Sequence, residues 1–544
     1  MKPNEIIMPK EKFVFAKRDE KIHDKELETK PLSYFADAMI RFRRNKGSIV
    51  AFFIISFLLL FSIVAPMLTP YKVVDRDAYF SFSLPKSRIA TALGLNFWDG
   101  CQVKETNEET FLRYYAMGVE TDHWAVKNQK FTLIEGEDDS GKITTLFKFR
   151  LDTYQDNSMV YMDLKQEDYD AIQKYQDETG ILIIYPITDP ELRPEAQQDK
   201  ADANFWYTTK KKNGKTVSLA TRVTKTDEKG KTYYDYEYEN IYIAYTGLDE
   251  NGAPKDGYTS KVTLESVQGL DTNGQARLYN YSTHNQTGYN VRVNYYEYYI
   301  YYHTQVLKDK ISEPLFFFGS NELGKDIFTC LGSGARLSFF LAIAVSVVNL
   351  FVGAIYGSIE GYYGGRIDLA MERFVEILSA VPFMIVITLL KYHMEGSNTL
   401  LILFISFFLT GWIGMAGRTR MQFYRFKNSE YVLASRTLGA KDPRVMFKHI
   451  FPNSLGTIIT GSVLAIPSVI FSETSLSYLG IINLETGKYT SVGTLLANGQ
   501  TCLQQFPHVI LWPSLFICLL MLSFNLFGNG LRDAFNPSLR GVED

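Results

Sequence analysis

Cysteine is scarce in this chain, and its positions follow no metal-binding or disulfide pattern. Cys101, Cys330, Cys502 and Cys518 are scattered without CxxC or Cys/His spacing, so neither a disulfide framework nor a zinc site is indicated. We therefore expect four isolated thiols, and the residues predict neither a metal ion nor a cofactor.

An excess of positive charge is also lacking, because 57 Lys and Arg stand against 60 Asp and Glu. Nucleic-acid binding usually needs a concentrated basic face, so we exclude nucleic acid as a partner. A cleavable signal peptide is not indicated either. Residues 1–46 are mostly polar, and the apolar stretch that follows them is too long for an h-region.

Long apolar runs are confined to the start and the C-terminal part of the chain. Residues 47–68 contain no charged side chain, and ~20 helical residues cross the ~30 Å hydrocarbon core of a bilayer. Five similar runs follow later, so we predict six transmembrane helices. These later runs are 337–357, 374–390, 399–414, 455–471 and 509–527.

The basic residues predict an orientation in the membrane. A basic cluster within residues 41–46 precedes the first run, and residues 417–453 carry eight Lys and Arg against two acidic residues. Clustered Lys and Arg beside a span mark the cytoplasmic side. We therefore expect both termini and residues 417–453 in the cytoplasm of a bacterial cell, and residues 72–316 outside it.

Residues 72–316 are polar and rich in tyrosine, and they are numerous enough to fold independently. Their alternating runs and turn residues predict an inserted α+β domain with more strand than helix. Residues 295–302 predict a last strand that leads back to the membrane, with an aromatic binding face as the alternative. The other expected elements are hairpins over 131–149 and 205–219, a helix over 163–179 and a strand over 181–185.

Residues 430–453 form the most informative segment, because they predict a helix, a stop and a second helix. Gly439 suits the stop, and Asp442 can cap the next helix with Pro443 at its first position. Ala434 and Ser435 are small enough to let a partner approach one helical face. Periodicity alone leaves two interpretations open, a docking lever or an amphipathic hairpin on the membrane surface.

The same segment resembles the EAA loop of ABC importer permeases, whose pattern is Glu-Ala-Ala, three residues, Gly, and then Ile-Leu-Pro about ten residues on. Here Leu433-Ala434-Ser435, Gly439 and Ile450-Phe451-Pro452 stand at these positions, with departures at Leu433, Ser435 and Phe451. The resemblance implies that this loop couples to an ATPase. The coupling residues so assigned are Glu430, Ala434, Ser435, Gly439, Ala440, Asp442, Pro443, Ile450 and Pro452.

Four further segments resemble the C-type permease subunit of oligopeptide and dipeptide importers; they are 42–46 with 65–71, 319–326, 334–338 and 530–540. The resemblance implies a second permease subunit, two cytoplasmic ATPase subunits, an extracytoplasmic peptide-binding subunit and a lipid membrane as partners. It implies no bond chemistry in this chain. The division that follows is a cytoplasmic segment 1–46, a first span 47–68, an inserted domain 72–316, and a five-helix permease core 317–544 with its coupling loop at 417–453.

Ionisable residues and prolines within the spans are candidates for the pathway or for hinges, namely Glu376, Pro382, Pro467 and Glu473. The alternative is that both glutamates reach water near span ends, or that Glu376 pairs with a basic residue. Residues 319–325 begin like a P-loop, but Asp326 replaces the Ser or Thr that holds magnesium. We therefore expect ATP hydrolysis on another polypeptide.

Three other functions remain as alternatives. The chain could be a membrane-anchored sensor with an extracellular ligand-binding domain, or a membrane anchor for a surface enzyme or adhesion module. Within transport, the same motifs occur in importers of nickel or another small solute.

Overall fold

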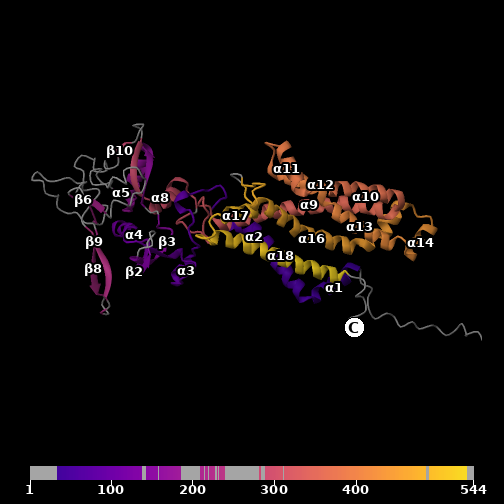
Figure 1. Ribbon diagram of the computed structural model, residues 1–544, viewed down its shortest axis with the longest axis horizontal. Helices are drawn as coiled ribbons and strands as arrows, with labels where there is room; N and C mark the ends of the chain where they lie inside the picture. Colours follow the sequence, from indigo (N-terminus) through magenta and orange to yellow (C-terminus); the bar gives the residue numbers. More distant parts are fainter. Residues whose placement is uncertain are drawn as a thin grey trace, which may run out of the picture.

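The computed structural model describes residues 34–137, 143–156, 159–185, 209–212, 215–218, 220–226, 230, 232–238, 281–282, 288–309, 311–485 and 489–535. A bundle of long helices and a mixed helix and strand region lie end to end (Figure 1). We call the end of the bundle that adjoins the mixed region the insert end. The other end, near α14, is the hairpin end.

Among the described residues, five helical stretches are long and apolar enough to cross a membrane. They are α2 (Lys46–Leu68), α9 (Ile327–Tyr363), α12 (Thr399–Gly411) with α13 (Ile413–Phe426), α15 (Asp442–Arg444) through α16 (Phe451–Tyr478), and α18 (His508–Ala534). A bent pair, α10 (Gly365–Ser379) and α11 (Phe383–His393), makes a sixth if it counts as one span. The six predicted spans are thus present as helices.

The third predicted span is not the single helix expected over 374–390. α10 and α11 meet at 71°, and Pro382 is the N-cap residue of α11. Proline has no N–H to donate, and it drives the preceding residue out of the helical region. The break therefore falls where the proline stands.

Helix α9 lies at the centre of the bundle and contacts α2, α13 and α16. Three glycines four residues apart let it approach α13 closely. A Cβ atom at Gly357 would lie 2.1 Å from the Ala416 carbonyl oxygen, and one at Gly353 or Gly361 would also meet the α13 side. Small residues at this spacing are typical of packed membrane helices.

The described residues of the inserted region form two small antiparallel sheets of three or more strands and two separate two-stranded hairpins. The first has the order β1-β3-β2, and α4 packs on it through Phe111. The second has the order β10-β11-β4, with β5 also paired to β11. The first sheet and its helices are α3 (Arg88–Ala92), β1 (Cys101–Thr106), α4 (Glu108–Thr121), β2 (Val126–Glu137) and β3 (Ile143–Asp152); the second comprises β4 (Met159–Lys165), α5 (Gln166–Thr179), β5 (Ile184–Tyr185), β10 (Tyr281–Ser282) and β11 (Gly288–Asn294).

The hairpin predicted over 131–149 is confirmed, with Phe131 opposite Phe149. β6 (Thr209–Lys212) pairs with β7 (Lys215–Ser218), while residues 205–208 and 219 of the second predicted hairpin lie outside the described residues. A further hairpin joins β8 (Ala220–Thr226) and β9 (Thr232–Tyr238). The helix predicted from residue 163 begins only at Gln166, because Asp163 still pairs with Asn290 in the sheet.

The predicted last strand over 295–302 is wrong. The strand ends at Asn294, and Tyr295–Tyr301 forms α8, followed by the π-helical turn η7 (Tyr302–Val306). The Asn294 side chain accepts hydrogen bonds from the backbone N–H groups of Tyr296 and Glu297. Such a cap favours a helix start over strand continuation.

Candidate functional site

The predicted helix-stop-helix lies at the hairpin end, between α13 and α16 (Figure 1). α14 (Glu430–Thr437) is followed by a turn, then by α15 and the π-helical turn η8 (Val445–Ile450), which continues into α16. Gly439 ends the first helix in the left-handed conformation, with φ 82°. Glycine adopts this conformation without the steric cost that a Cβ atom brings. We call residues 430–453 the coupling hairpin.

Asp442 has a different role from the predicted cap. Lys441 is the N-cap residue of α15, and its side chain makes no capping hydrogen bond. The Asp442 carboxylate instead accepts a hydrogen bond of 2.6 Å from the Tyr362 hydroxyl of α9. The Arg436 guanidinium lies 5.0 Å from the centre of the Tyr362 ring. Tyr362 therefore contacts both arms of the hairpin.

One face of the coupling hairpin is buried against the bundle. Val432 of α14 and Val445, Met446 and Ile450 of the second arm are buried in one apolar cluster with Tyr362 and Phe423 of α9 and α13. Close packing of this kind resists deformation. A displacement of the hairpin should therefore reach α9, α13 and α16 as a movement of whole helices.

The opposite face presents apolar side chains to the surroundings. Leu438 is 88% exposed, and Leu433 and Phe447 are about half exposed. Lys441, Arg444 and Lys448 are exposed close to them along the chain. An exposed apolar group with charged neighbours is typical of a protein docking surface.

The structure places the predicted coupling residues on both faces. Ile450 is in the buried cluster, and Ser435 and Ala440 are half-buried. The exposed ones are Glu430, Ala434, Gly439, Asp442, Pro443 and Pro452. Sequence reasoning missed Tyr362, because no motif joins residues 362 and 442.

A charged cluster behind the hairpin was also missed. Arg420 of α13 contacts Asp368 (2.7 Å) and Glu372 (2.7 Å) of α10 and lies 3.5 Å from Glu360 of α9. These contacts join three helices near the hairpin end. The sequence did contain a signal for this cluster, because these four ionisable residues lie within or beside apolar runs.

The four pathway or hinge candidates do not gather at one place in the fold, since Glu376 and Pro382 belong to the bent pair and Pro467 and Glu473 to α16. Glu376 is exposed and pairs with Arg373. Glu473 is 1% exposed and accepts hydrogen bonds from Ser338 of α9 (2.9 Å) and Ser477 (3.1 Å). The alternative in which Glu473 reaches water near a span end is therefore wrong.

The P-loop-like segment at 319–325 connects two distant parts of the chain at the insert end, through an ion pair. The buried Lys325 ammonium lies 2.7 Å from the Glu485 carboxylate. Burial raises the pKa of Glu485, but hydrogen bonds from Lys325 and Asn498 outweigh it and hold the pKa below its usual range. Asp326 caps α9 by accepting from the backbone N–H groups of Phe328 and Thr329.

The tyrosines of α8 and η7 line a cavity of about 330 Å³ at the insert end, and the aromatic binding face considered as the alternative for residues 295–302 would lie here. Tyr295, Tyr298, Tyr299 and Tyr302 share it with charged residues that follow α2, namely Lys72, Asp75, Arg76 and Asp77. Burial raises the pKa of Asp77 above its usual value, although a hydrogen bond donated by Tyr295 acts to lower it.

Comparison with known proteins places the chain among transport permeases. Residues 349–541 match the family described as binding-protein-dependent transport system inner membrane component, and residues 33–85 match the N-terminal TM domain of oligopeptide transport permease C. The oligopeptide transport system permease protein OppC of Bacillus subtilis is 43% identical over 43% of this chain and 75% of its own length.

Two other relatives show comparable sequence similarity, and one solved structure was matched at much lower identity. The dipeptide permease protein DppC of B. subtilis is 40% identical over 41% of this chain and 69% of its own length. OppC of Escherichia coli K12 is 35% identical over 41% of this chain and 73% of its own length. An inward-facing structure of the MetNI methionine ABC transporter is 14% identical, with a TM-score of 0.31 over 38% of this chain and 96% of that one.

Proposed function

The chain belongs to the family of inner-membrane permease components of binding-protein-dependent transport systems, and we propose that it forms, with a second permease subunit, an ABC importer pathway for oligopeptides or dipeptides. Members of this family are membrane subunits of transporters and not enzymes. ATP hydrolysis then belongs to two separate cytoplasmic ATPase subunits. A peptide-binding subunit outside the cytoplasm delivers the substrate.

The coupling hairpin is the observation that carries this proposal. Its buried face is fixed on α9 and α13, and its exposed face offers Leu433, Leu438 and Phe447 to a partner. Closure of the ATPases pushes on this surface, and the packed helices respond by rigid-body rocking between inward and outward openings. The chain transmits force and breaks no bond.

The orientation follows from the same assignment. Figure 1 shows α14 at the end of the bundle opposite the inserted domain, with α1 (Tyr34–Arg44) on the bundle side. If the hairpin meets cytoplasmic ATPases, residues 72–316 lie outside the cytoplasm and both termini lie inside. The basic residues of 417–453 support this orientation.

Copurification from the native membrane in mild detergent tests the function. We expect a second permease and two ATPases with the full chain, whereas a sensor or a simple anchor predicts no ATPase. Uptake of labelled peptides, compared with uptake of nickel, then tests the substrate class.

A single substitution tests the docking surface. Leu438→Asp places a charge on the most exposed leucine of the hairpin, and we expect ATPase association to weaken by about 2 kcal/mol, roughly thirtyfold. Leu479→Asp is the matched control, because Leu479 is 61% exposed at the other end of α16. Equal ATPase binding by both variants would contradict the assignment.

A further inference from the structure

A short loop of the inserted domain exposes three large apolar side chains. Ile89 is 72%, Leu93 68% and Phe97 60% exposed, and they lie in and just after α3. We call residues 88–98 the α3 loop and these three side chains its apolar tip. Exposed side chains of this size in one short segment indicate a contact with something apolar.

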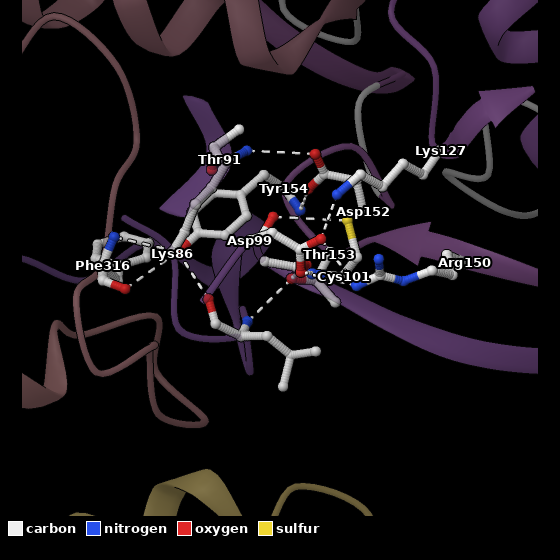
Figure 2. Close-up of polar contacts among 12 residues, drawn as sticks. Lys86, Thr91, Asp99, Cys101, Lys127, Arg150, Asp152, Thr153, Tyr154 and Phe316 are labelled. Atoms are coloured by element: carbon white, nitrogen blue, oxygen red, sulfur yellow. Dashed lines mark hydrogen bonds and ion pairs between the residues drawn. The ribbon is translucent and has the colours of Figure 1, made fainter. Parts of the chain in front are cut away.

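The base of the loop is fixed by partly buried ion pairs, which Figure 2 shows together. The Asp99 side chain is 2% exposed and pairs with Lys127 and with Arg150, the latter at 2.8 Å. Lys86, just before the loop, lies 3.3 Å from Asp152. Both ends of the loop are therefore attached to the first sheet and its flanking segments.

Backbone hydrogen bonds close the loop on itself and on the return to the membrane. Ser87 N–H donates to the Trp98 carbonyl at 2.8 Å, and Lys86 N–H donates to the Phe316 carbonyl at 2.9 Å. The Asn96 carbonyl accepts from the Arg150 guanidinium at 3.2 Å. A loop held at so many points presents its apolar tip in one orientation.

Trp98 joins the α3 loop to a membrane helix. Its φ of 55° is unusual for a bulky residue, and such strain persists only where the surroundings impose it. The Trp98 ring stacks on Phe317 at 5.3 Å and on Trp512 of α18 at 5.4 Å. Trp512 stands one turn inside α18, so the loop is level with the start of that span.

The surface of α18 beside Trp512 is also apolar and extends the apolar surface that begins at the tip. Leu511, Leu515, Leu522 and Leu526 are all between 45% and 63% exposed, at a spacing that keeps them on one side of the helix. Tryptophan is enriched where a membrane helix meets the headgroup region. The tip therefore adjoins an apolar helix surface at the depth of a bilayer boundary.

We propose that the α3 loop is a membrane anchor of the inserted domain: Ile89, Leu93 and Phe97 enter the headgroup and acyl boundary of the bilayer beside α18. Apolar side chains at such an interface lie about 5–10 Å deep. The anchor fixes the domain over the insert end. It depends on the membrane location of α18 and not on the substrate or the ATPases.

Lipid quenching in nanodiscs tests the anchor on the full transporter complex. The four cysteines are replaced first, and Leu93→Cys then carries an environment-sensitive fluorophore. With lipids that bear a nitroxide near the headgroup, we expect a blue-shifted emission and strong quenching. The matched control is Lys174→Cys on α5, whose native side chain is 77% exposed, and we expect its label to be unquenched.

A second pair of variants tests whether the tip itself causes the insertion. Ile89→Ser with Phe97→Ser, added to the labelled chain, should remove most of the quenching at residue 93. Val103→Ser, which alters another 60% exposed apolar residue, should leave it unchanged. A label at 93 that nitroxide lipids never quench would overturn the proposal, as would protection of that label only by the second permease subunit.

Discussion

The buried ion pair between Lys325 and Glu485 shows what one residue contributes at the insert end. The Lys325 side chain is 1% exposed, and Glu485 also accepts a hydrogen bond of 3.1 Å from Asn498. Glu485→Gln leaves the buried ammonium without its counter-charge, so we expect a loss of about 3–5 kcal/mol of stability. Thermal unfolding in detergent measures it. Glu313→Gln, in the exposed pair with Arg88, should cost at most about 1 kcal/mol.

The same pair predicts a pH dependence. The folded pKa of Glu485 lies below its ordinary value of 4.5, so the folded state binds this proton less tightly than the unfolded state. The stabilisation is complete above pH ~4.5 and is lost as pH falls through the lowered folded pKa. We expect the difference in unfolding temperature between the native chain and Glu485→Gln to shrink over that acid range. A constant difference would contradict the assignment.

The sequence could predict which residues belong to the coupling hairpin, but not all of their contacts. Gly439 was assigned correctly as a helix stop, since its need for a positive φ is local. Asp442 was assigned wrongly as a cap, because its partner Tyr362 is 80 residues away. The burial of Glu473 likewise depends on Ser338, which lies on another helix.

The coupling hairpin is an element whose shape depends on one turn. Gly439→Pro is incompatible with φ 82°, because proline fixes φ near −65°, and it also removes the N–H that donates to Arg436. We expect it to abolish ATPase association and transport while leaving membrane insertion intact, as measured by copurification and peptide uptake. Gly396→Pro is the matched control, since Gly396 has φ 83° at the insert end. Retained peptide uptake in Gly439→Pro would refute the coupling role.

Element types followed the apolar pattern closely, and the misses have physical causes. The spans could be predicted because a bilayer requires about twenty apolar residues in a helix. The bend between α10 and α11 was missed because the apolar run continues through Pro382 while the helix does not. Tyr295–Tyr301 was predicted as a strand from its aromatic content. The Asn294 side chain instead caps the backbone N–H groups that follow it, which favours a helix.

The whole molecule separates two surfaces at opposite ends of one helical bundle. Tyr71 and Phe316, at the two junctions of the inserted domain, have ring centres 4.9 Å apart, so the domain leaves and rejoins the bundle at one place. Such adjacent ends are how a domain can be inserted without disturbing its host. The family motifs on both sides of the insert could be recognised in the sequence. The insert itself carries no comparable family motif, so its fold could be predicted only from local patterns.

This separation predicts the sidedness of labelling in intact cells. In a chain without its native cysteines, Lys174→Cys in the inserted domain should react with a membrane-impermeant maleimide added outside. Leu438→Cys at the coupling hairpin should react only after the membrane is permeabilised, although its native side chain is 88% exposed. If the bent pair counts as one span, the described helices make six crossings, an even number, as the proposed orientation requires. Labelling of residue 438 in sealed cells would place the hairpin outside, where no cytoplasmic ATPase can reach it.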